Sequence, residues 1–308
     1  MPEKLPPSFS RNISRRTFFS GIGGFIANHW LLSTLSLGGA GGLLWAEHDT
    51  LALKRETWDL FYPNLPAALE GKTICQLSDL HLETLRLTPE HIDQMVMSQK
   101  PDLLVITGDI ISSSKDLDKI DSYLGKLTAT YGKFVVMGNN DYSHLSHTLF
   151  KRYLLQLQNL GWTPLLNDAS FLANLNLWII GVDDPATRHD NVDQAYQKVF
   201  SSPAPPFRLV LAHSTDCLDD VAEYGADLLL TGHTHGGQIR LLGLPPFITN
   251  TYLGDEGIYE GYHVINGVPL YISRGIGESV ISLRLNVPPE IAFFTLHKGD
   301  AQPKHKTS

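Results

Sequence analysis

Short apolar runs recur along the chain from residue 72 to residue 231, and glycine or polar residues end each of them. Runs this short, bounded by turn residues, predict buried strands rather than helices. The strands expected on this basis cover residues 72–78, 102–107, 133–137, 177–182, 207–212 and 228–231. We expect further short strands near Thr163 and Phe171 and in the tail up to about Leu296.

Longer amphipathic stretches lie between several of these runs and predict helices over residues 88–100, 116–131 and 145–160. Thr88-Pro89 gives the first helix a start signal, because it places an N-cap residue before a proline at the first helical position. Strands that alternate with helices indicate a parallel sheet joined by crossover helices. We therefore expect one α/β domain over residues 72–297, followed by a disordered polar tail over residues 298–308.

Metal-binding residue types follow the predicted strands at the point where each strand ends. In open α/β sheets, ligands bind beyond the carboxyl ends of the strands, so this edge is the expected site. The residues concerned are Asp79, His81, Asp109, Asn139, His213, His233 and His235. Carboxylate, amide oxygen and imidazole are ligands for Mn, Fe or Zn. These candidate ligands are too many for one metal ion and suit two. Two metal ions together would form a clamp for in-line attack on phosphorus.

His233 and His235 leave the predicted strand 228–231 between glycines. In an extended chain, residues two apart point the same way, so both imidazoles are expected on one side. The flanking glycines would let the backbone approach a bound ion and adopt positive φ.

The ordered series of motifs, D-x-H, G-D, G-N-x-D, H and G-H-x-H, resembles that of the calcineurin-like metallophosphoesterases across residues 72–297. The resemblance implies a four-layer α/β/β/α sandwich with two divalent metal ions, Mn first and Fe or Zn as alternatives. It also implies hydrolysis of a phosphate ester or diphosphate by a metal-bound hydroxide. In this family one ion would be held by Asp79, His81, Asp109 and His235. Asp109 would bridge to a second ion, held with Asn139, His213 and His233.

Features outside these motifs look like the membrane-associated bacterial branch of the family. They are Gly237-Gln238, the segment 181–184 and the segment 273–277, together with the N-terminus. That branch is linked to UDP-2,3-diacylglucosamine pyrophosphatase activity in lipid A synthesis, alongside members of unknown substrate. The substrate expected is a phosphorylated small molecule or a nucleotide-linked lipid. Two alternatives stay open: a metal-binding, catalytically weak membrane-anchored protein, and an exported phosphoesterase with an unrelated substrate.

Asn140 departs from the family pattern, which most often has histidine at this position to contact the phosphate and help the leaving group depart. Asparagine donates a hydrogen bond but cannot deliver a proton. Either the enzyme is impaired or its leaving group needs little protonation, as with a nucleotide leaving from a diphosphate. Asp141 is expected to orient residue 140. His144 and His147 are candidate replacement acids, although histidines at the start of a surface helix are more often merely solvated.

Two arginines are candidate phosphate ligands, since a guanidinium donates in a planar fork. They are Arg188 and Arg274, and Arg274 has the better case because it lies in the glycine segment that resembles the family. The apolar stretch 241–248, directly after the metal histidines, is expected to pack a loop or to form a lip for an acyl chain.

The first 46 residues form the expected signal or anchor segment. Ser14-Arg15-Arg16-Thr17-Phe18-Phe19 looks like a twin-arginine export signal, and no charged residue occurs from Thr17 to Ala46. That run is long enough to cross a bilayer, which takes about 20 residues. We expect membrane association, with the side of the membrane left open, and a connecting stretch over residues 47–71. Because UDP-linked substrates are cytoplasmic, the export signal and the lipid A interpretation point to opposite sides.

Composition narrows the choice of partners. The 308-residue chain has a net charge of -8, which argues against nucleic-acid binding through a basic surface. Its two cysteines, Cys75 and Cys217, are too few for a disulfide framework or a thiolate cluster. We expect a monomer.

Overall fold

The computed structural model describes residues 38–201, 206–241, 244–246, 249–279 and 281–306. The twin-arginine motif, residues 17–37 of the expected anchor and part of the apolar stretch 241–248 lie outside the described residues. The chain divides into two units, residues 1–45 and residues 46–308. None of the helices within the described ranges has the length and apolar composition needed to cross a membrane.

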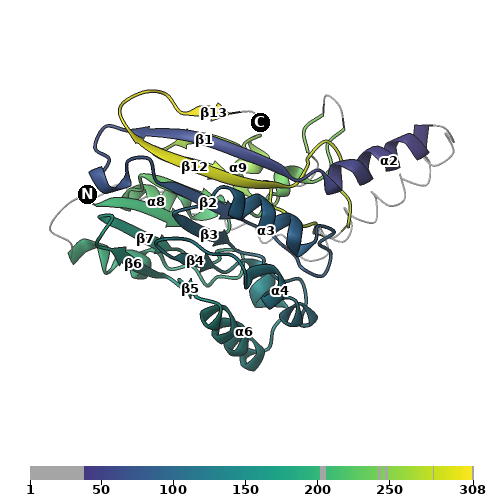
Figure 1. Ribbon diagram of the computed structural model, residues 1–308, viewed down its shortest axis with the longest axis horizontal. Helices are drawn as coiled ribbons and strands as arrows, with labels where there is room; N and C mark the ends of the chain where they lie inside the picture. Colours follow the sequence, from purple (N-terminus) through teal and green to yellow (C-terminus); the bar gives the residue numbers. More distant parts are fainter. Residues whose placement is uncertain (1–37, 202–205, 242–243, 247–248, 280, 307–308) are drawn as a thin grey trace, which may run out of the picture. The chain divides into compact units, whose positions relative to one another are not determined.

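Two sheets form the framework of residues 46–308. Within the described residues, the first has seven strands, which can be followed in Figure 1. Their order is β13 (Lys304–Lys306), β1 (Lys54–Tyr62), β12 (Glu290–Lys298), β2 (Thr73–Leu77), β3 (Leu103–Thr107), β4 (Lys133–Val136), β5 (Trp162–Pro164). Strands β2 to β5 are parallel, as the alternation of strands and helices predicts.

The second sheet has six strands among the described residues. Their order is β10 (Gly261–Ile265), β11 (Val268–Ile272), β9 (Leu228–Thr231), β8 (Phe207–Leu211), β7 (Leu177–Gly181), β6 (Asp168–Leu172). Strands β7, β8, β9 and β11 are parallel to one another, while β6 and β10 run antiparallel at the two edges. The four central strands therefore end on one side of this sheet.

Among the described residues, alternating side chains of the buried strands divide the core into three clusters. Ile74 and Val105 of the first sheet pack with Leu209 of the second, so this cluster lies between the sheets. Their neighbours Cys75 and Leu104 face the opposite way. Each such apolar side chain stabilises the fold by about 1.5–3 kcal/mol when fully buried.

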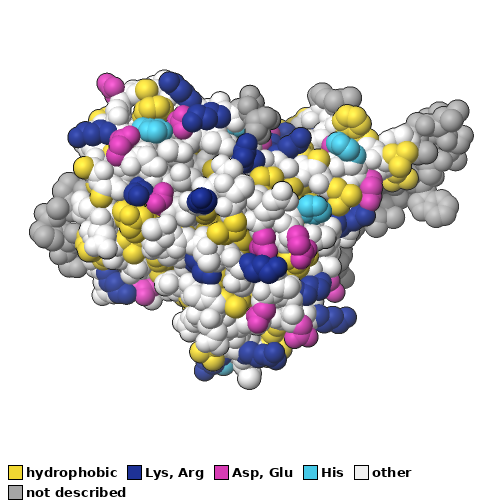
Figure 2. All heavy atoms as spheres, viewed as in Figure 1, with side chains coloured by type: hydrophobic (Ala, Val, Ile, Leu, Met, Phe, Trp, Pro, Cys, Tyr) yellow, Lys and Arg dark blue, Asp and Glu magenta, His cyan; other side chains and the backbone are white. Residues whose placement is uncertain are grey.

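Helices cover the two outer faces. On the first sheet, α3 (Pro89–Ser98), α4 (Ile120–Leu124) and α6 (His147–Asn159) contribute to the cluster that contains Leu104. On the second sheet, α7 (Val192–Tyr196) and α8 (Leu218–Tyr224) contribute to the cluster that contains Val210. The order helix, sheet, sheet, helix is the predicted four-layer sandwich. Figure 2 shows basic and acidic side chains interspersed on the face that it views.

Two stretches outside the predicted domain are strands, contrary to expectation. The connecting stretch 47–71 contains β1, which pairs in parallel with β12 along its whole length and buries Leu60 between the sheets. The tail expected to be disordered contains β13, which pairs with β1 and stacks His305 on Trp58 at 4.6 Å between ring centroids. Charged residues in both segments hide the strand pattern, and each segment forms a strand by pairing with a neighbour, β1 with β12 and β13 with β1.

The helix expected over residues 116–131 is much shorter in the structure. A 3-10 helix, η2 (Ser114–Asp118), leads into α4, which ends at Gly125. The chain then returns towards the sheet, where the Tyr131 N–H donates to the carbonyl of Asp102. The threonines of this segment favour extended backbone over helix, because β-branched side chains lose χ1 freedom in a helix.

Candidate metal centre

The predicted ligands meet at the carboxyl ends of five strands drawn from both sheets. Asp79 and His81 follow β2, Asp109 follows β3, and Asn139 begins the short helix α5 (Asn139–Ser143) after β4. From the second sheet, His213 follows β8, and His233 and His235 follow β9. Because parallel strands end on the same side, residues more than 150 positions apart in the sequence come within contact.

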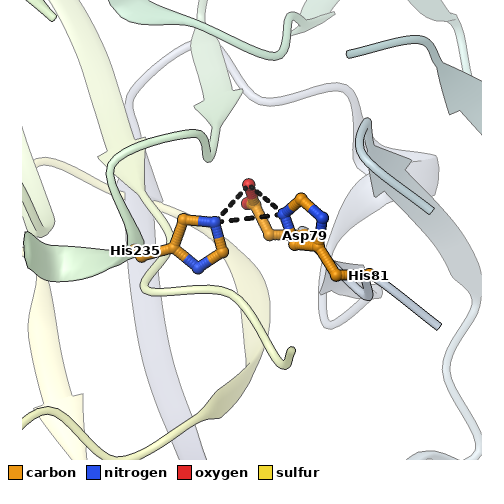
Figure 3. Close-up of side chains that lie close together, drawn as sticks. All are labelled: Asp79, His81 and His235. Atoms are coloured by element: carbon orange, nitrogen blue, oxygen red, sulfur yellow. Dashed lines mark hydrogen bonds and ion pairs between the residues drawn. The ribbon is translucent and has the colours of Figure 1, made fainter. Parts of the chain in front are cut away.

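Asp79, His81 and His235 form the first donor group (Figure 3). Their side chains point toward one another, with the two Nε2 atoms 3.1 Å apart. The Oδ1 atom of Asp79 lies 3.4 Å from Nε2 of His235 and 4.0 Å from Nε2 of His81. Two imidazole nitrogens and one carboxylate oxygen thus converge on a small space, which is the donor arrangement of a metal site.

Asp109, His213 and His233 form the second donor group. Nδ1 of His233 lies 3.0 Å from Nε2 of His213. The Oδ2 atom of Asp109 lies 3.3 Å from Nε2 of His213 and 3.6 Å from Nε2 of His81, which belongs to the first group. One carboxylate oxygen therefore stands between the two groups, where a bridging ligand would be.

Asn139 adds a seventh donor, and the surroundings of its side-chain oxygen suit a bound cation. Its Oδ1 atom is buried and has no hydrogen-bond partner among the described residues. A buried carbonyl oxygen left without a partner costs about 1–3 kcal/mol, so such an atom calls for a partner such as a metal ion. Together with the imidazole and carboxylate donors, it gives a ligand set that suits two divalent ions.

The backbone at these strand ends is unusual, and it corrects one expectation. His233 and His235 have φ values of 69° and 51°, so the pair is not extended and its imidazoles enter different donor groups. Asp79, His81 and Asp109 also have positive φ. Non-glycine residues in this conformation cost about 1–3 kcal/mol each and cluster at functional sites.

Glycines bring the strand ends close enough for the two groups to form. A Cβ atom on Gly138 would lie 2.2 Å from Oδ1 of Asp109, and one on Gly232 would lie 2.3 Å from Oδ2 of Asp79. No side chain fits at such distances, so the glycines of G-N and G-H are required by packing against the carboxylates themselves.

Burial and charge keep most of these groups in ligand form. Burial lowers the pKa of His81 and of His233, and it lowers the pKa of His235 to about 3. Burial opposes ionisation of Asp109, but His213 and the other histidines outweigh it and hold the pKa of this carboxyl well below its usual range. The same pairing raises the pKa of His213 against the effect of burial.

Outer contacts fix the orientation of the histidines. His81 Nδ1 lies 2.7 Å from the Ser112 hydroxyl, and His213 Nδ1 lies 2.7 Å from the carbonyl of Thr107. Because a carbonyl only accepts, Nδ1 of His213 carries a proton, so Nε2 is the nitrogen that would bind a metal ion. Arg284 is fully buried with Nη2 3.4 Å from Nδ1 of His235. Sequence reasoning missed Arg284, since no motif marks it.

Asn140 reaches the shared carboxylate directly. Its backbone N–H donates to Asp109 Oδ1 over 2.8 Å, and its Nδ2 donates to Oδ2 over 2.6 Å. Oδ1 of Asn140 lies 3.1 Å from Nε2 of His144, whereas His147 starts α6 as an exposed residue.

Asp141 holds the strand ends together. Its buried carboxylate accepts from the backbone N–H groups of Asp109, Ile110 and Gly138, and from the hydroxyl of Tyr153. Burial and then Asp109 raise its pKa to about 7. The contacts of Asp141 are thus mainly to the loop backbone, and its effect on the orientation of residue 140 stays a prediction.

The two candidate arginines differ in place and partners. The Arg274 guanidinium forms ion pairs with Glu56 and Glu290, and Arg188 is an exposed residue with positive φ. These carboxylates disfavour the predicted use of Arg274 as a phosphate ligand, which stays a prediction.

Comparisons with known proteins agree with this geometry. Residues 72–237 match the family model described as calcineurin-like phosphoesterase. The uncharacterized metallophosphoesterase YkoQ of Bacillus subtilis is 30% identical over 253 residues, covering 80% of this chain and 92% of YkoQ. A second one from that organism, YkuE, is 29% identical over 301 residues, covering 93% and 98%. The UDP-2,3-diacylglucosamine pyrophosphatase LpxG of Chlamydia muridarum is 27% identical over 308 residues, covering 80% and 91%.

Proposed function

The chain belongs to the calcineurin-like phosphoesterase family, and we propose from this premise that it hydrolyses a diphosphate or an activated phosphate ester with two divalent ions. The main support for this proposal is the position of Asp109, whose Oδ2 atom lies within 3.6 Å of imidazole nitrogens from both donor groups. Asp79, His81 and His235 would hold one ion. His213, His233 and Asn139 would hold the other, and Asp109 would be shared.

Two bound ions would supply Lewis acidity for the phosphoryl oxygens and would lower the pKa of water at the site. We expect Mn²⁺ first, because the donors are imidazole, carboxylate and amide oxygen and none of them is a thiolate. The chain itself supplies orientation. Asp109 gathers the two groups, and Asp141 holds the loops that carry Asp109 and Asn139.

Asn140 decides which bonds are cleaved best. Its Nδ2 group, held beside Asp109, is placed to donate a hydrogen bond to a phosphoryl oxygen. An amide N–H is not acidic, however, so Asn140 cannot transfer a proton to the leaving group. An alkoxide leaving group departs poorly without an acid, whereas a phosphate or nucleotide departs unaided. We therefore favour diphosphates over simple alkyl phosphomonoesters.

UDP-2,3-diacylglucosamine is the specific substrate that we propose to test first. The support is the similarity to LpxG together with the diphosphate in the substrate that LpxG's name gives. At 27% identity the relation is distant, so a different diphosphate is the main competing outcome.

Membrane attachment through the N-terminal segment is the second part of the proposal. The absence of charged residues from Thr17 to Ala46 supports it. A reporter fused to the C-terminus gives the side of the membrane. Activity of a cytoplasmic reporter alone would exclude export through the twin-arginine motif and strengthen the nucleotide-lipid assignment.

The test of the enzyme itself uses bis-p-nitrophenyl phosphate and added Mn²⁺, because this ester's leaving group needs no acid. The full chain should turn it over, and Asp109→Asn should remove nearly all of that activity by withdrawing the shared charge. Two bound metal ions per chain without cleavage of this ester or of any diphosphate would show a metal-binding protein that lacks catalysis.

A further inference from the structure

Four large apolar side chains are exposed around the loop that carries the histidines of the metal centre. They are Leu51, Leu241, Leu244 and Ile281, with exposed fractions of 45%, 45%, 52% and 39%. We propose that these residues, the apolar rim, dock onto a lipid surface and hold the metal centre beside it.

Direct contacts attach the rim to the turn that follows His235. Gln238 comes three residues after His235, and its Nε2 group donates to the carbonyls of Ile281 and Leu283 over 2.6 Å and 3.1 Å. The segment that follows Leu244 packs on the histidine turn so closely that a Cβ on Gly237 would lie 2.0 Å from Cβ of Pro246. The rim is therefore fixed to the same turn that presents His235.

A second set of contacts joins the end of helix α2 (Gly38–Leu51) to the rim. The backbone N–H of Asn286 donates to Asp49 Oδ2 over 2.6 Å, and its Nδ2 donates to the carbonyl of Arg240 over 2.7 Å. The backbone N–H of Arg284 donates to the Thr50 hydroxyl over 2.8 Å. Leu51 and Leu241, far apart in the sequence, each follow directly on a residue of this network.

The chain that precedes these contacts identifies the occupant as lipid. The run without charged residues ends at Ala46, three residues before Asp49. It is longer than the roughly 20 residues that a bilayer crossing requires. The part of the sequence best suited to lipid therefore directly precedes Asp49 and Thr50, whose contacts lead to the rim. Clustered exposed apolar side chains mark interaction sites, and the uncharged run that directly precedes this part of the chain indicates a bilayer as the occupant.

Docking of the rim would specify the substrate class of the proposed function, and this part of the inference rests on that function. A metal centre held at a lipid surface meets phosphate groups at headgroup level, so the substrate class would be a lipid carrying a phosphate or diphosphate. Docking itself requires no catalysis and is measured without substrate.

The experiment places an environment-sensitive nitrobenzoxadiazole dye at the rim of the full-length chain reconstituted in phosphatidylethanolamine and phosphatidylglycerol vesicles. Leu244→Cys and Ile281→Cys provide the labelling positions. Cys75 and Cys217 are buried and should not react. Leu155→Cys on α6 is the matched control, since Leu155 is 59% exposed and lies in a helix that packs on the first sheet.

We expect doxyl-labelled lipids to quench the dye at residues 244 and 281 several-fold more than at residue 155. Equal quenching at all three positions, or none at the rim, would overturn the proposal. Protection of the rim from aqueous iodide without quenching by doxyl lipid would also overturn it, because residues 17–37 or another protein would then cover the rim. Turnover of bis-p-nitrophenyl phosphate, measured on the same vesicles, tests the proposed function separately.

Discussion

Nε2 of His144 lies 3.1 Å from Oδ1 of Asn140, one helical turn earlier at the start of α5. An amide oxygen only accepts, so the imidazole donates this hydrogen bond and the amide is turned with Nδ2 toward Oδ2 of Asp109, 2.6 Å away. His144 thereby sets the direction of the one side-chain donor that Asn140 can offer.

Replacing His144 by alanine should lower kcat about two- to tenfold, because one orienting hydrogen bond contributes about 0.5–1.5 kcal/mol. His144→Gln keeps an N–H donor and should retain more activity. The measurement is kcat and KM with bis-p-nitrophenyl phosphate, with metal content checked in each variant. In an Asn140→Ala background the same change should have no further effect, since the partner is gone. Equal losses in both backgrounds would assign His144 some other role.

Replacing Asn140 by histidine should raise hydrolysis of alkyl phosphomonoesters more than hydrolysis of diphosphates. General acid catalysis is typically worth about 10² to 10⁴ in rate, and only the poorer leaving group needs it. Both substrate classes are compared in both proteins at equal metal content. If the natural protein already cleaves alkyl esters as fast as diphosphates, another group supplies the proton and the inference from Asn140 to diphosphate chemistry is wrong.

Gly138→Ala should disrupt the centre, because its Cβ would lie 2.2 Å from Oδ1 of Asp109. A displacement of about 1 Å at a reacting group can cost about 10²-fold in rate, and we expect a loss of that order together with loss of bound metal. The control is Gly42→Ala, where an added Cβ would meet nothing within 4 Å beyond the neighbouring backbone of its own helix. Full metal content and activity in Gly138→Ala would show that Asp109 does not need its present position.

Asp183 should make stability depend on pH. Burial raises its pKa to about 6, although the Tyr142 hydroxyl and the Asp184 N–H donate to it. The folded state then retains a proton that the unfolded state has lost, so stability falls as pH rises from about 4 to about 6. Asp183→Asn removes this cost, and its advantage over the natural protein should grow by about 2–3 kcal/mol between pH 4 and pH 7.5.

Denaturant unfolding of both proteins in chelator at the two pH values gives this difference. Asp168→Asn is the control, because the Asp168 side chain is 47% exposed. An advantage that does not change with pH would mean that the pKa of Asp183 is the same in the folded and the unfolded protein.

The sequence by itself determined the strands that carry the centre and the residue types at their ends. Leu228–Thr231 is a strand as predicted, and β2, β3, β4 and β8 lie within the predicted ranges. A short apolar run is a local signal for a strand buried on both faces, so these strands could be predicted without knowing which strands pair with them. Parallel pairing then requires their carboxyl ends to share one edge, which is why the donors could be collected before any distance was known.

Only the tertiary structure decided the backbone conformation of the histidine turn and which segments complete the sheet. An extended chain would point His233 and His235 the same way, yet both have positive φ and they enter different donor groups, as the family resemblance implied. In this conformation the His233 N–H donates to the carboxylate of Asp79. β1 and β13 are strands because β12 and then β1 offer them an open edge. Such pairing depends on residues more than 200 positions away. The local sequence of a short charged segment therefore does not predict that it forms a strand.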